Sequence, residues 1–141
     1  MMTGKTVIDH ESATRILRTV HISNAFLFFT DIGEYTGEYA TSLGDFRDKL
    51  GKIPTASIAF HFGRGDYERW SKGILGDEYL AERFSKIKRP SEEEKIRRSI
   101  QRIARRRLNQ LERHLQRERR SIGDKQHALQ VHVSSLFDIH R

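Results

Sequence analysis

The spacing of apolar residues predicts short helices over most of residues 12–88. Apolar residues at steps of 3, 4 and 3 from Leu43 to Ile53 define one helix face, and Ser42 is the expected N-cap of that helix. The same pattern predicts helices at 13–20 with Ser12 as N-cap, at 54–62 after Pro54, and at 67–75 and 78–87, where Asp66 and Asp77 follow glycines as N-caps. These elements predict a compact, mainly helical domain.

The run NAFLFFTDI interrupts this helical pattern. It is continuous, rich in aromatic residues, and followed by Gly33 and Gly37. Such a run is typical of a β-strand, and its lack of polar alternation predicts that both faces are covered. We therefore expect a mainly α fold with a minor strand or hairpin near 25–40.

Beyond Pro90 the pattern changes to one long helix. Ser91 is the expected N-cap, and the helix should run over 91–121. Its apolar stripe has steps of mostly 3 and 4 and comprises Ile96, Ile100, Ile103, Ala104, Leu108, Leu111 and Leu115. The steps drift from strict heptads, which favours packing on a neighbouring helix over a long coiled coil. Gly123 and Asp124 should end the helix and begin a short closing element at 124–140, for which helix and strand both fit. The chain thus divides into 12–88 and 91–141.

The positive charge is concentrated in this second part. The whole chain carries a net charge of +7, yet residues 86–120 alone hold 14 Lys and Arg against 5 Asp and Glu, and residues 1–85 are slightly acidic. A charge so localised describes an interaction surface rather than a general aid to solubility.

Opposite the apolar stripe the long helix presents a row of arginines, namely Arg98, Arg102, Arg105, Arg106, Arg113 and Arg120. Arginine binds phosphate with a planar fork, and few acids are placed to neutralise the row. The pattern predicts a non-enzymatic protein associated with nucleic acid or a ribonucleoprotein. The helix lacks aromatic residues in this stretch, so base stacking on single strands is not indicated. The alternative is an interaction or oligomerisation module that binds an acidic protein, or the acidic 31–48 loop of its own or a second chain.

A second group of polar residues lies around the sequence FGRGD, which is expected to form a tight turn. His61, Arg64 and Asp66 could together hold a phosphate or carboxylate. The alternative is structural: Gly63 and Gly65 make a reversal, Asp66 caps a helix, Arg64 pairs with a nearby acid and His61 bonds a backbone carbonyl. We favour the structural interpretation, because a carboxylate at the helix N-terminus opposes a bound anion.

Other features exclude functions more than they suggest them. The absence of cysteine removes disulfides and thiolate chemistry. No apolar run approaches the roughly 20 residues of a membrane span, and the N-terminus has no apolar core of signal-peptide type, so a cytoplasmic location is expected. We interpret the acidic residues between 31 and 48 as part of a solvated loop. The histidines at 114, 127, 132 and 140 lack metal-ligand spacing. No metal, cofactor, membrane or catalytic residue is predicted.

Three blocks also resemble a known family. TGEYATSLGDF (36–46), SIAFHFGRGDYERW (57–70) and LGDEYLAERF (75–84) resemble the T-G-x-x-A-x-S-L, F-H-x-x-R-G-D-Y-x-x-W and L-G-D-x-x-L-A blocks of small uncharacterised prokaryotic proteins that carry a domain of unknown function. The resemblance covers about residues 25–87. It implies a shared fold, and it supplies no reaction and no catalytic residues.

Overall fold

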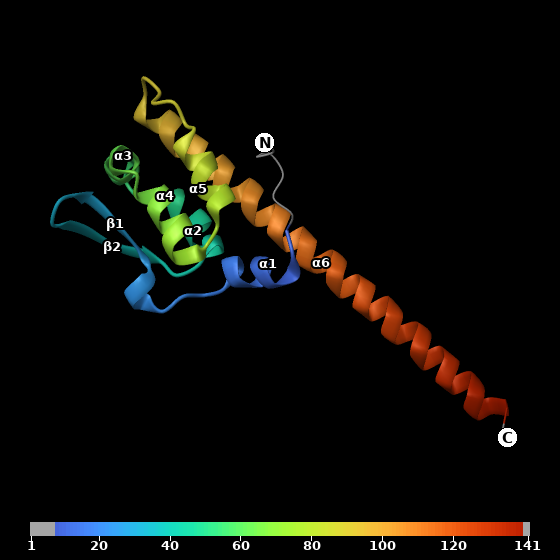
Figure 1. Cartoon of the computed structure of the whole chain (residues 1–141). Helices are drawn as coiled ribbons and strands as arrows, with labels where there is room; N and C mark the ends of the chain where they lie inside the picture. The colour runs from blue at the N-terminus through green and yellow to red at the C-terminus, as the bar shows by residue number, and fades with distance from the viewer. Residues whose placement is uncertain (1–7, 140–141) are drawn as a thin grey trace.

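The computed structural model describes residues 8–139, with side chains described as far as Gln130. Figure 1 shows a helical body from which one long helix extends, with the C-terminal end of that helix far from the β-hairpin. The elements, in chain order, are α1 (His10–Leu17), a 3-10 turn (Ile22–Asn24), β1 (Phe26–Asp31), β2 (Glu34–Ala40), α2 (Leu43–Leu50), α3 (Thr55–Arg64), α4 (Asp66–Trp70), a π-helical turn (Ser71–Leu75), α5 (Glu78–Ser85) and α6 (Glu93–Ile139). The predicted class, mainly α with a minor hairpin, is confirmed.

The hairpin is antiparallel and irregular. Phe26 pairs with Ala40 and Asp31 with Glu34, with two shifts of register between them. Phe26 and Phe28 are buried, whereas the Leu27 side chain between them is 41% exposed. The prediction that both faces of this strand are covered is therefore wrong. The strand buries alternate residues, as a sheet with one face on the core does.

Side-chain caps begin several of the helices. The backbone N–H of Asp45 donates to Ser42 Oγ over 3.1 Å and that of Leu80 donates to Asp77 Oδ1 over 3.1 Å, so both predicted caps are confirmed. At α1 the expected cap is wrong: Asp9, not Ser12, is the N-cap, and its Oδ1 accepts from the Ser12 N–H over 2.7 Å. Asp fills this position as well as Ser does, and the helix gains a turn at its start.

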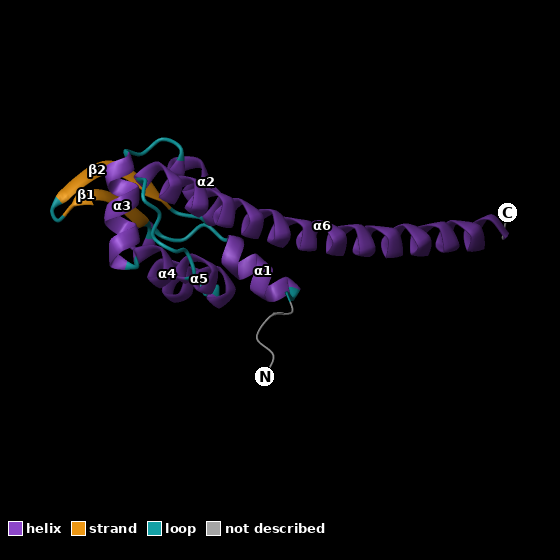
Figure 2. Ribbon diagram, turned by 90° about the horizontal axis from the view of Figure 1, so that it is seen from above, coloured by secondary structure: helices purple, strands orange, loops and turns teal. Residues whose placement is uncertain are grey.

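The core joins the hairpin to every helix of the body. Phe26, Phe28, Phe46, Tyr67 and Trp70 form its aromatic centre, with ring centroids 4.9–5.9 Å apart. The predicted α6 stripe belongs to the same core, because it is buried from Ile96 as far as Leu111. Figure 2 shows this half of α6 running along the body beside α1 and α2, so Pro90 lies in a connection between packed helices.

The long helix does not end near Ser121. It continues as one α-helix through Gly123 and Asp124 to Ile139, so the predicted helix end and the separate closing element at 124–140 are wrong. A glycine inside a helix costs only about 1 kcal/mol relative to alanine, and Gly123 does not adopt the positive φ of a helix-ending glycine. The 47 residues of α6 give a rod of about 70 Å.

Two glycines do end helices in the left-handed conformation. Gly65, with φ 71°, ends α3, and Gly76, with φ 77°, precedes α5. Gly63 was expected to share in the first reversal, but it lies within α3 and has no positive φ. A side chain at Gly76 would also meet the Arg15 guanidinium, since a Cβ there would lie 3.1 Å from Arg15 Nε.

Candidate functional site

The six predicted arginines form one exposed surface of α6, which we call the cationic face: Arg98, Arg102, Arg105, Arg106, Arg113 and Arg120. At 100° per residue they fall within an arc of about 100°, centred opposite the buried stripe. From the first to the last the rise is about 33 Å. None of the ion pairs among the described residues involves any of the six. In particular, none pairs with the acidic 31–48 segment.

Two other arginines of α6 point into the body, where their hydrogen bonds stabilise the fold. Arg97 donates to the backbone oxygens of Leu50 and Ile53 over 2.6 and 2.8 Å, and thereby holds the connection between α2 and α3. Arg107 is 5% exposed and forms a bidentate ion pair with Asp77. Its Nε donates to Asp77 Oδ2 over 2.7 Å and its Nη2 donates to Asp77 Oδ1 over 3.0 Å. These contacts leave neither guanidinium free for a phosphate.

The acids of the 31–48 segment do not converge on a catalytic arrangement. Lys49 pairs with Glu38 and Asp45 at 3.6 and 3.4 Å, and Arg47 pairs with its neighbour Asp48 at 3.0 Å. Asp45 also accepts from the Thr41 N–H over 3.1 Å. Glu38, Asp45 and Asp48 are therefore paired locally, and residues 31–48 lie in the hairpin and the start of α2 rather than in the solvated loop predicted from the sequence.

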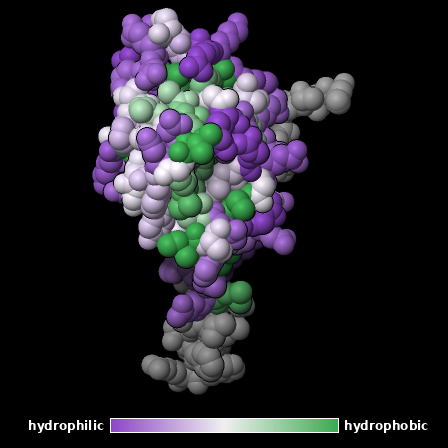
Figure 3. All heavy atoms as spheres, turned by 90° about the vertical axis from the view of Figure 1, so that its left-hand side faces the viewer, coloured by the Kyte–Doolittle hydropathy of each residue, from purple (hydrophilic) through white to green (hydrophobic). Residues whose placement is uncertain are grey.

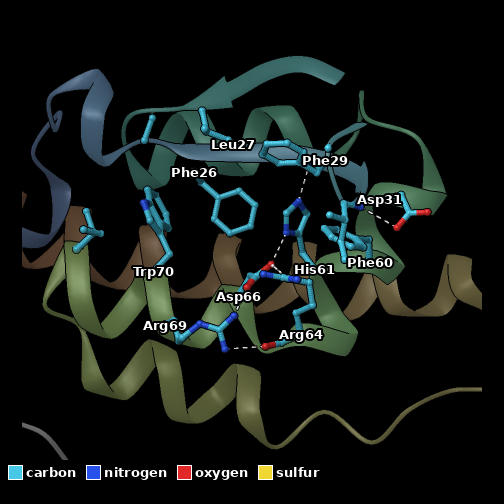
Figure 4. A pocket seen from close by; sticks show the side chains of 14 residues that line it. Phe26, Leu27, Phe29, Asp31, Phe60, His61, Arg64, Asp66, Arg69 and Trp70 are labelled. Atoms are coloured by element: carbon cyan, nitrogen blue, oxygen red, sulfur yellow. Dashed lines mark hydrogen bonds and ion pairs between the residues drawn. The ribbon is translucent and has the colours of Figure 1, made fainter. Parts of the chain in front are cut away.

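His61, Arg64 and Asp66 do come together, beneath β1 (Figure 4). Asp66 Oδ2 lies 2.7 Å from His61 Nδ1 and accepts from Arg64 Nε over 3.2 Å, while Asp66 Oδ1 accepts from Arg69. Arg69 was not predicted, although its place three residues after Asp66 on a helix is a recognisable ion-pair spacing. The carboxylate is thus fully engaged within the cluster.

The other nitrogen of His61 is also occupied. The Phe29 N–H donates to His61 Nε2 over 2.9 Å, which places the ring proton on Nδ1, facing Asp66. The predicted bond to a backbone carbonyl is wrong, because the ring accepts from a backbone amide instead. The predicted helix cap is wrong as well: Asp66 makes no side-chain cap, because its carboxylate faces His61 and the two arginines. A histidine with both nitrogens bonded to protein has no free nitrogen to act as a base on a substrate.

An open groove of about 500 Å³ lies beside this cluster. Apolar side chains from β1, α3 and α4 line it, including Leu27, Phe29, Phe60 and Trp70. Figure 3 shows a band of apolar side chains down this side of the molecule with hydrophilic residues on both sides. The arginines at its rim are held by Asp66, so the groove offers apolar contact more than anion binding.

The histidine cluster makes stability depend on pH. Burial lowers the pKa of His61 below its usual value, with the Asp66 hydrogen bond and charge opposing this shift. The unfolded chain therefore binds the proton more readily than the folded one, so the contribution of His61 to stability is complete above about pH 6.5 and lost as the pH falls. We expect urea unfolding to show that the wild type loses more stability between neutral pH and pH 5 than His61→Gln does. Parallel pH dependence of the two proteins would contradict this prediction.

The remaining histidines assemble no metal site in the part of the chain that is described. Within residues 8–130, whose side chains the structure describes, no group of three or more His, Cys, Asp or Glu side chains could hold an ion. His114 and His10 both lie near Glu118, at 3.4 and 3.3 Å. His132 and His140 fall outside the described side chains. No helix among the described residues is both long and apolar enough to cross a membrane.

Comparisons with protein-family models, with curated proteins and with solved structures found no match. The resemblance of residues 25–87 to a prokaryotic family of unknown function therefore stays a prediction.

Proposed function

We propose that this protein is a non-enzymatic binder of nucleic acid, which it holds through phosphate contacts with the cationic face of α6. The observation that carries the proposal is the exposure of all six arginines on one unbroken helix, without an acidic partner among the described residues. Like charges at i,i+4, such as Arg98 with Arg102 and Arg102 with Arg106, repel by a few tenths of a kcal/mol per pair. A polyanion relieves this repulsion.

The dimensions of the face favour a double-stranded ligand. Its length of about 33 Å is close to one turn of duplex, which is about 34–36 Å. Between Glu93 and Leu136 the helix carries no Phe, Tyr or Trp on which unpaired bases could stack. Contacts between arginine forks and phosphate oxygens supply the affinity, and such contacts carry no direct sequence information. We therefore expect binding that depends on salt and little on sequence.

A second candidate, a protein-interaction module, is favoured by the apolar band of Figure 3. Leu27, Ile32 and Tyr35 of the hairpin region are exposed beside the groove. Exposed apolar patches bounded by polar residues are typical of interaction surfaces. No described residue of α6 lines the groove, so substitutions can separate the two functions.

The salt dependence of binding tests the proposal. Six phosphate contacts predict that the logarithm of the binding constant for duplex DNA falls with log salt at a slope of about −5. In the triple variant Arg102→Gln, Arg106→Gln and Arg113→Gln, the slope should shrink to about −2.7, because each lost contact removes about 0.9. Fluorescence anisotropy with labelled duplexes of two unrelated sequences measures both the slope and the sequence dependence.

The matched control removes three exposed positive charges outside the cationic face: Lys52→Gln, Lys72→Gln and Arg83→Gln. It has the same net charge as the triple variant, and it should keep the wild-type slope. If the two triple variants lose the same part of the slope, binding follows net charge alone and the cationic face is not the site. If duplexes do not bind even at low salt, the proposed function is wrong.

A further inference from the structure

The groove beside the His61 cluster has the size and the lining of a small-molecule site. Its volume of about 500 Å³ lies within the range of roughly 300–1,000 Å³ that is usual for pockets that bind small ligands. Figure 4 shows β1 as one wall and α3 and α4 as the other. The indole N–H of Trp70 donates to the backbone oxygen of Asn24 over 2.9 Å, which fixes the ring at one end of the groove. The apolar walls are therefore held in place by the fold itself.

Arg64 lines this groove and has hydrogen-bonding capacity that the cluster does not use. Its Nε donates to Asp66 Oδ2 over 3.2 Å, but its two terminal nitrogens make no hydrogen bond among the described residues. Arg69, by contrast, uses both of its terminal nitrogens, on the Arg64 backbone oxygen and on Asp66. The Arg64 guanidinium lies 5.1 Å from the centre of the Phe60 ring, and its side chain is half exposed. Its free nitrogens can therefore take a carboxylate as a two-point ligand.

The charge of the cluster favours an anionic group at this point. Arg64 and Arg69 share the single carboxylate of Asp66. Burial lowers the pKa of His61, so the ring is neutral at pH 7 and the cluster keeps one positive charge. Asp31 also lines the groove, but its Oδ1 accepts from the next backbone N–H over 2.7 Å, and Figure 4 shows this carboxylate directed away from the cluster.

We propose that the groove binds a small amphipathic anion, whose apolar body lies along Leu27 and Trp70 and whose carboxylate binds the terminal nitrogens of Arg64. A medium-chain fatty acid is a molecule of this class. Apolar contact supplies most of the affinity, and the one guanidinium sets the direction in which the ligand lies. No described residue of α6 lines the groove, so this site stands or falls independently of the proposed nucleic-acid binding.

Trp70 provides the readout, because it lines the groove and is the single tryptophan of the chain. Three probes share one alkyl chain and differ in the head group: decanoate, decanol and decyltrimethylammonium, each used below the concentration at which it forms micelles. Titration calorimetry and Trp70 fluorescence should show saturable binding of one decanoate per chain. Decanoate should bind about 10-fold more tightly than decanol, and the cation should bind most weakly. No saturable binding of decanoate, several molecules per chain, or equal affinity for the three probes would overturn the proposal.

Arg64→Gln separates the head-group contact from a general attraction of anions to a basic protein. This variant should weaken decanoate binding by about 10-fold and leave decanol binding unchanged, and the latter result also shows that the groove is intact. Arg83→Gln removes the same charge from an exposed position outside the groove and should bind decanoate as the wild type does. If both variants lose affinity for decanoate equally, the anion is held by net charge and the site at Arg64 is wrong.

Leu27→Gln tests the contact with the apolar body. Leu27 lines the groove and is 41% exposed, so the substitution removes apolar surface without opening the core. Binding of decanoate and of decanol should weaken together, by about fivefold. Ile22→Gln is the matched control, because Ile22 is 54% exposed and lies outside the groove. Unchanged binding of both probes to Leu27→Gln would contradict the proposed position of the apolar body.

Discussion

Replacing Arg107 by alanine should destabilise the protein by about 3–5 kcal/mol, which is a large part of the stability of a small domain. Its guanidinium donates to both oxygens of Asp77, and the two side chains are 5% and 1% exposed. Asp77 also accepts from the Leu80 N–H as the cap of α5. Removing the arginine leaves a buried carboxylate without its counter-charge, and ions are costly to keep unpaired away from water.

Arg106 provides the control for this prediction. It is the adjacent residue in the sequence and in the helix, but it is exposed and makes no ion pair among the described residues. Arg106→Ala should therefore change the free energy of unfolding by no more than about 0.5 kcal/mol. Urea denaturation of both variants measures the difference. A similar loss of stability in the two would contradict the structural role of Arg107.

This arginine also shows where reading the sequence fails. The apolar stripe of α6 was predictable because its period repeats over five turns, and its first part is buried as expected. Position 107 lies between Ala104 and Leu111 on that same face, yet the predicted stripe does not include it. A single cationic residue inside an apolar stripe predicts that a buried acid pairs with it, because charged side chains are rarely buried unpaired. In this protein the acid is Asp77. The distance of 30 residues between the two concealed the pair.

The candidate sites were predictable to different degrees. Exposure of the cationic face follows from helical geometry alone, since any residue opposite a buried stripe faces water. The His61 cluster depends on β1, because the Phe29 N–H and the Asp66 carboxylate reach the ring from two different elements. Local spacing cannot reveal such a contact. The local sequence instead predicted that Asp66 caps a helix, because Asp is one of the preferred N-cap residues.

Phe46→Ala should give the second large loss, again about 3–5 kcal/mol. The ring is 1% exposed and lies within 6.3 Å of five other aromatic centroids, so it joins the hairpin to α4 and α5. Truncation removes its apolar burial and leaves a cavity that these large rings cannot fill without moving. Thermal or urea unfolding of the purified variant provides the measurement.

Tyr35→Ala is the comparison for Phe46. It also truncates an aromatic side chain, but Tyr35 is on the exposed side of β2 and its ring lies near Phe29 alone among the described aromatic residues. We expect a loss of at most about 1 kcal/mol, the scale of one cross-strand aromatic pair. If Phe46→Ala lost no more free energy of unfolding than Tyr35→Ala does, the aromatic centre would not be the main source of stability.

The continuity of α6 has a consequence for the arginines that it carries. Since one uninterrupted helix spans the body and its extension, the interval between Arg98 and Arg120 is set by helical rise and by nothing else. A single inserted residue between them would turn the outer arginines by about 100° away from the inner ones. The helix therefore fixes both the spacing and the direction of these charges, and a change of one residue in its length is enough to split the single charged surface into two that face different ways.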